Sequence, residues 1–248
     1  MKMVNNGAAF AGYVLPALRQ PRVGIDNLVF DDLGEAVLRI HNERFKGVLY
    51  IEDTREYKPN QPISYSNVPR VFSYNSILHE LTGGNIKIFG PEQVVQYGNQ
   101  IPERTTTYAD TDAIAVFTRK GPNEAYRKVI QDIIGMRSSK IPVFVSGLGV
   151  EKADNKEGFN FIETDFIDLI PAPYLTKDQK ITYDPKKGLV AAQEGVHVWV
   201  SEDKSGIRRV YRDGDGVLGC RDEDLLNSDV DGRVQVVQHP KGRAPAAE

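Results

Sequence analysis

The residues best suited to chemistry lie near the C-terminal end, where aspartates alternate with other residues over 213–216 and again over 227–232. An EF-hand calcium loop needs oxygen donors at positions 1, 3, 5 and 12 and a glycine at position 6. The first stretch would place Tyr211 at position 1 and Asp222 at position 12, and the second would end on Gln238. Because Asp-Gly pairs are common in tight turns, the pattern favours turns. A calcium-binding structural module remains the alternative, through four aspartates of loops 213–231: Asp213, Asp215, Asp229 and Asp231.

Two other local patterns point away from cofactor binding and nucleophilic catalysis. Gly147 and Gly149 follow an apolar run, but Lys152 stands where the third glycine of a dinucleotide-binding loop belongs, so a tight turn is favoured. The single cysteine, Cys220, excludes an internal disulfide and a multi-cysteine zinc site. Its acidic neighbours would raise the pKa of its thiol and disfavour a nucleophilic thiolate.

Paired carboxylates are the remaining catalytic candidates. Asp110 with Asp112, or Asp165 with Asp168, could divide acid and base roles, but 34 acidic residues make such pairs common by chance. The four histidines have no metal-binding spacing: His41, His79, His197 and His239. We therefore predict no catalytic residue, no bound metal and no cofactor. An enzyme acting through these aspartates or through segment 147–168 is a less favoured alternative.

Composition limits the partners. The chain has 248 residues, of which 40% are hydrophobic and 26% charged, enough for one or two domains with a sizeable core. No apolar run approaches the roughly 18–20 residues that a membrane span needs. A net charge of −3 provides no basic field for nucleic acid. Residues 1–18 do not form a clear signal peptide, which leaves a cytoplasmic location and a virion or cell-surface association both open.

Periodicity and capping residues predict helices in the first part of the chain. Asp32 and Glu35 have the spacing of a capping box, which predicts a helix over 33–45. Further helices are expected over 75–82 and 124–135, with one helical turn over 92–97 and a loop over 57–72.

The second part of the chain is rich in strand patterns. Apolar or alternating runs predict these strands: 48–52, 86–89, 113–117, 142–145, 196–200, 207–211 and 233–237. Shorter apolar runs lie at 159–162 and 166–170, after a charged loop at 147–160. Because the helices precede residue 140 and the strands dominate after it, we predict an α+β fold with a β-rich C-terminus.

Segment 207–211 (IRRVY), the Asp/Gly/Cys-rich loop after it, and Gly232-Arg233-Val234 before a final strand resemble a known arrangement. They resemble the C-terminal variable region of proteins diversified by diversity-generating retroelements. In that family an error-prone copying step, often at asparagine codons, rewrites the 3′ end of the gene. The resemblance covers about 206–238. It implies a C-type-lectin-like fold, with two helices beside a small, mostly antiparallel sheet, and a hypervariable face that binds a target protein.

The amino-acid usage of this region agrees with the resemblance. Changes at the first two bases of an asparagine codon never give Lys, Glu, Gln, Met or Trp. These five types make up 44 of the 248 residues, so about four are expected by chance within 211–232. Only Glu223 is found there, although a turn-rich loop by itself also favours Asp, Gly and Asn over these five types.

The resemblance also assigns roles. It implies framework roles for seven positions: Ile207, Val210, Leu218, Leu225, Gly232, Val234 and Val236. It implies display for eleven positions of the variable region, which spans about 206–234: Tyr211, Arg212, Asp213, Asp215, Gly219, Arg221, Asp222, Asp224, Asn227, Asp229 and Asp231. Tyr211, Arg212 and Arg221 would be the energetic anchors.

The resemblance also suggests domain boundaries. Residues 1–45 would form an N-terminal segment with one helix, 46–238 the lectin-like domain and 239–248 a flexible tail. Helices 75–82 and 124–135 would be the two beside the sheet. The sugar-binding signatures of calcium lectins are absent, so no carbohydrate is expected.

Overall fold

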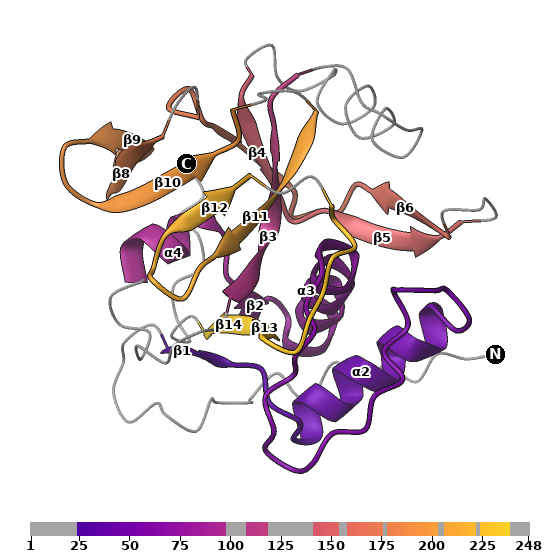
Figure 1. Cartoon of the computed structure of the whole chain (residues 1–248). Coiled ribbons are helices and arrows are strands. Elements are labelled where there is room, and N and C mark those ends of the chain that lie inside the picture. The colour runs from indigo at the N-terminus through magenta and orange to yellow at the C-terminus, as the bar shows by residue number, and fades with distance from the viewer. Residues whose placement is uncertain are drawn as a thin grey trace.

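The structure is a computed structural model. It describes residues 24–97, 108–118, 141–153, 158–175, 178–202, 206–221 and 224–238. Within these ranges, three helices pack against a large curled sheet and two small sheets (Figure 1). The predicted α+β class is confirmed. The predicted helix 124–135 and the tail 239–248 lie outside the described residues.

Helix α2 (Asp32–Arg44) confirms the predicted helix 33–45 with one correction at its start. The N-cap is Asp31, whose Oδ1 accepts hydrogen bonds from the backbone N–H groups of Leu33 and Gly34. Asp32 therefore occupies the first turn of the helix, where an acidic side chain also favours the helix dipole.

Helix α3 (Val68–Thr82) is seven residues longer at its start than the predicted helix 75–82. The predicted loop 57–72 is wrong at its end, where the helix has already begun. The side chain of Asn67 accepts a hydrogen bond from the backbone N–H of Arg70 and caps the helix there. Gly83 ends the helix in the left-handed conformation, as its sequence position indicated. The predicted helical turn at 92–97 is confirmed by α4 (Pro91–Tyr97).

The predicted strand 48–52 is wrong, since this segment forms turns. The backbone N–H groups of Ile51 and Glu52 both donate to the carbonyl of Val48. This turn buries Val48 and Ile51 and leaves Leu49 and Tyr50 exposed. Two buried residues three positions apart therefore enclose two exposed ones. An alternating strand would bury every second residue instead.

In the described part of the chain, the large sheet has nine strands in the order β7-β4-β3-β11-β12-β10-β8-β9, and β13 also pairs with β3. Its strands are β3 (Tyr108–Val116), β4 (Val143–Ser146), β7 (Asp168–Pro171), β8 (Gln179–Asp184), β9 (Gly188–Ala192), β10 (Val196–Val200), β11 (Ile207–Arg212), β12 (Leu218–Cys220) and β13 (Gly232–Arg233). The pairs β10–β12 and β13–β3 are parallel and the others antiparallel, so the sheet is mostly antiparallel, as expected.

Two small sheets complete the fold. In one, β14 (Gln235–Gln238) lies between β1 (Gly24–Asn27) and β2 (Ile86–Ile88). In the other, β5 (Gly149–Lys152) pairs with β6 (Phe159–Ile162), so part of the predicted loop 147–160 is a strand. Pairing of β1 with β14 joins the two ends of the described chain. Residues 24–45 therefore pack into the same core as the C-terminal strands.

The core lies on both faces of β3. Ile114 and Val116 pack in a cluster with α2 and α3, whereas Ala115 packs in a second cluster with α4. Strand alternation therefore places α3 and α4 on opposite faces. The seven framework positions are all buried, as expected: Ile207, Val210, Leu218, Leu225, Gly232, Val234 and Val236. No helix in the described ranges is long and apolar enough to cross a membrane.

Candidate binding surface

One row of residues crosses four neighbouring strands of the large sheet. Trp199 of β10 lies opposite Gly219 of β12, Gly219 opposite Tyr211 of β11, and Tyr211 opposite Asp110 of β3. Side chains that stand directly opposite in a sheet share one face. A Cβ atom at Gly219 would lie 2.6 and 2.7 Å from the two Cε atoms of Tyr211, so the tyrosine ring lies across this glycine. The missing side chain at Gly219 therefore lets the ring lie flat on the sheet.

A buried ion pair fixes one end of this row. Arg209 Nη2 donates to Asp110 Oδ2 over 2.8 Å, and Arg209 Nε donates to Oδ1 of the same carboxylate. The hydroxyl of Ser66 also donates to Asp110 Oδ2, over 2.7 Å. Burial by itself would lower the pKa of Arg209, but the attraction and hydrogen bonds of Asp110 raise it. The guanidinium therefore stays charged inside the protein.

The same guanidinium supports two tyrosine rings. Its Cζ atom lies 4.5 Å from the ring centroid of Tyr108 and 5.4 Å from that of Tyr211. The two rings meet edge to face with centroids 6.2 Å apart. The backbone N–H of Asp229 donates to the Tyr108 hydroxyl over 3.3 Å. These contacts join the turn at 229–231 to the row on β11.

Trp199 anchors the opposite end. Its indole Nε1–H donates to Nδ1 of His197 over 2.8 Å, and the Arg221 guanidinium lies 5.1 Å from its ring centroid. Arg221 in turn forms an exposed ion pair of 3.1 Å with Asp178. We call the continuous set of these residues the aromatic strip: Tyr108, Trp199, Arg209, Tyr211, Gly219 and Arg221.

The structure brings most of the predicted display positions to this strip or to the turns beside it. Tyr211 and Arg221 belong to the strip, and the β11–β12 turn carries Asp213 and Asp215. Tyr211 and Asp213 are half-buried, and six positions are exposed: Asp215, Arg221, Asp224, Asn227, Asp229 and Asp231. Asp222 lies outside the described residues.

Two of the predicted display positions are wrong. Arg212 is only 6% exposed, because strand alternation turns it to the face opposite Tyr211, and burial lowers the pKa of its guanidinium. Gly219 is buried beneath the Tyr211 ring. Arg212 therefore does not serve as a surface anchor, and Gly219 acts by supporting Tyr211.

The acidic loops have the turn geometry that their sequence favoured. Asp213 Oδ1 accepts the backbone N–H of Asp215 over 3.0 Å, and Asp229 Oδ1 accepts that of Asp231 over 2.8 Å. Each aspartate thus stabilises its own turn. In the part of the chain that the structure describes, no three or more His, Cys, Asp or Glu side chains are grouped to hold a metal ion.

Three of the residues considered for catalysis, Asp110, Asp112 and Cys220, are buried in the structure. Asp110 serves the ion pair, while Asp112 is buried, accepts from Asn75 Nδ2 over 3.4 Å, and has its pKa raised by burial. The pKa of the Cys220 thiol is also raised, by burial rather than by carboxylates as the sequence suggested. Gly147 occupies a left-handed turn between β4 and β5, as expected.

Sequence reasoning missed three members of the strip. Trp199 gave a signal, because it alternates with His197 along 196–200 and so shares its face. Arg209 gave a similar signal, because it alternates with Tyr211 along 207–211, but its partners Tyr108 and Asp110 lie about a hundred positions away, and Tyr108 gave no signal.

Comparison with known proteins gives no relative. No family model matches this chain, and no curated protein or solved structure shows significant similarity to it.

Proposed function

We propose that this chain is a non-enzymatic binding protein with a C-type-lectin-like organisation, and that its C-terminal face binds a target protein. The observation that carries the proposal is the aromatic strip. It gathers Tyr211 and Arg221 of the variable segment with Trp199 on one face of the sheet. Tyr, Trp and Arg are the residue types that contribute most to protein–protein binding energy.

The strip is preorganised, which favours affinity. The buried pair of Arg209 and Asp110 holds the tyrosine rings from below, and the Tyr211 ring rests on Gly219. Rings that are already ordered lose little conformational entropy when a partner covers them. The half-exposed rings supply apolar contact area, and the exposed charged groups around them supply a polar rim.

The division between buried and exposed positions suits diversification. Within 206–234, the framework residues lie in the core, while the turn at 227–231 is largely exposed and the turn at 213–216 is half-buried with Asp215 exposed. Surface substitutions usually change stability by less than about 0.5 kcal/mol. We propose that a retroelement rewrites the exposed codons of this segment and that the fold tolerates the changes.

A selection experiment tests the binding proposal. A phage-displayed library of random 12-residue peptides is selected on the full-length protein and, in parallel, on the variant W199A/Y211A. We expect peptides that bind the wild-type protein and lose binding to the variant, because the variant lacks both ring platforms. Circular dichroism and thermal melting verify that the variant is folded.

The matched control is E151Q/E194Q, which changes two exposed side chains outside the strip. Peptides selected on the wild-type protein should bind this control equally well. If no selected peptide distinguishes the wild-type protein from W199A/Y211A, the strip is not a binding surface and the proposal is wrong.

A further inference from the structure

Exposed carboxylates surround the aromatic strip. Asp178 lies at its Trp199 end, Asp215 in the β11–β12 turn, and Asp229 and Asp231 at its Tyr108 end. All four are exposed. The negative charges of this face therefore border a set of aromatic rings.

The cations of the strip and of the turn beside it are already engaged. Arg209 is buried with Asp110, and Arg221 is paired with Asp178. Arg233, beside the 229–231 turn, donates to the backbone carbonyls of Val230 and Gly232. These cations leave part of the surrounding negative charge uncompensated.

Two carboxylates stand out as available. Within the described ranges, neither the Asp215 nor the Asp231 carboxylate makes a hydrogen bond or an ion pair; only their backbone N–H groups are used by the turns. The side chains of Asp213 and Asp229 accept those N–H groups and shape the turns. Asp215 and Asp231 can therefore interact with a partner without loss of turn geometry.

The rings themselves favour cations. The face of a tyrosine or tryptophan ring is negatively polarised and attracts guanidinium and ammonium groups within about 6 Å. The strip already demonstrates this preference, because Arg209 lies 4.5 Å from the Tyr108 centroid and Arg221 lies 5.1 Å from that of Trp199. A further cation on the solvent side of Tyr211 or Trp199 would meet both a ring and a nearby carboxylate.

We propose that the segment that binds the aromatic strip is basic: a stretch of protein chain whose arginine or lysine side chains lie against Tyr211 and Trp199 and pair with Asp215 and Asp231. This inference rests on the proposed function and adds the chemistry of the partner. Charge complementarity of this kind steers association and excludes acidic surfaces and phosphate backbones.

The peptides selected above supply the probe. Those that depend on Trp199 and Tyr211 are sequenced and synthesised with a fluorescent label, and their binding is measured by fluorescence anisotropy at about 50 and 500 mM salt. We expect a net positive charge in the selected peptides and weaker binding at high salt. The variant D215N/D231N should bind about two- to thirtyfold more weakly at low salt, as expected for two exposed ion pairs.

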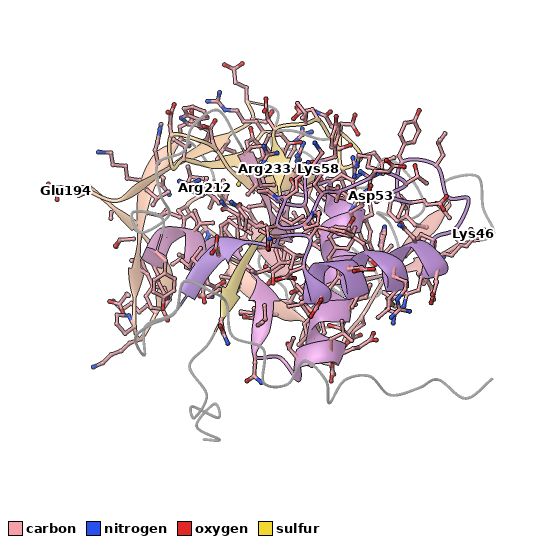
Figure 2. All side chains as sticks on the ribbon, turned by 90° about the horizontal axis from the view of Figure 1, so that it is seen from below. Lys46, Asp53, Lys58, Glu194, Arg212 and Arg233 are labelled. Carbon is pink, nitrogen blue, oxygen red and sulfur yellow. The ribbon has the colours of Figure 1, made fainter. Side chains whose placement is uncertain are left out.

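The control E151Q/E194Q removes the same charge from other parts of the surface. Figure 2 shows Glu194 at the outer edge of the molecule, well separated from Arg233 beside the strip. Equal loss of affinity in this control would show that only net charge matters and would overturn the inference. Strip-dependent peptides that are neutral or acidic would overturn it too, while leaving the proposed function intact. Absence of any strip-dependent peptide would instead overturn the proposed function.

Discussion

The ion pair beneath the strip gives the sharpest prediction about the fold. Asp110 is fully buried and Arg209 is 3% exposed, so D110N leaves a buried guanidinium without its counter-ion while it keeps the size of the side chain. Removal of one partner from a buried pair costs about 3–5 kcal/mol. We expect D110N to lower the free energy of unfolding by this amount at pH 7.

Urea unfolding followed by the fluorescence of Trp199, the only tryptophan, measures this effect. The variant S66A is the matched control, because it removes only the hydroxyl that donates to Asp110 and should cost about 0.5–1.5 kcal/mol. The double variant D110N/R209M should lose clearly less than the sum of the two single losses, since no unpaired charge remains. Additive losses, or a D110N loss below about 1 kcal/mol, would refute the reasoning.

Three further predictions follow from the same structure. G219A should displace the Tyr211 ring and lower the free energy of unfolding, measured in urea, by about 1–3 kcal/mol. It should also weaken the binding of the strip-dependent peptides, and unchanged affinity would contradict the packing of the ring on Gly219. Burial lowers the pKa of His41 to about 4 from 6.5, so the unfolded chain takes up a proton first as the pH falls. From pH 7 to pH 5 the wild-type protein should therefore lose about 2 kcal/mol more stability than H41Q, and parallel losses would contradict this. Burial raises the pKa of Asp112 above its ordinary value of 3.8, so the folded state loses stability as the pH rises from 3.8 through the raised pKa. The melting temperature of D112N relative to the wild-type protein should therefore rise from about pH 3 to about pH 7, whereas a constant difference would contradict this.

Local signals in the sequence were sufficient for elements with a clear period or cap. The helix over 33–45 was predicted within one residue at each end, and Gly83 correctly marked the end of α3. The first half of α3 was missed because its polar side chains, such as Arg70 and Ser73, make buried contacts that only the folded structure supplies. The strand predicted at 48–52 failed because its apolar residues pack as a turn.

The surface was harder to predict than the elements. Strands 196–200 and 207–211 were predicted, but the order β3-β11-β12-β10 that places Trp199 beside Gly219 is set by non-local pairing. Arg212 was predicted to be displayed with Tyr211, yet adjacent residues of one strand face opposite sides. The predicted strand ended at 211, and strand alternation would have separated the two had it continued to Arg212, where β11 ends, whereas the contact of Arg209 with Tyr108 could not be inferred.

The central claim is that the exposed face around the strip is diversified. Deep sequencing of the 3′ end of this gene and its downstream DNA in a natural population tests it most directly. We expect substitutions at the codons of Tyr211, Asp215, Arg221 and Asp231, few at the buried Arg212, and a nearby near-copy of the region with adenines at the variable sites. If codons 211–231 vary no more than the rest of the gene, the claim of a diversified binding face is contradicted.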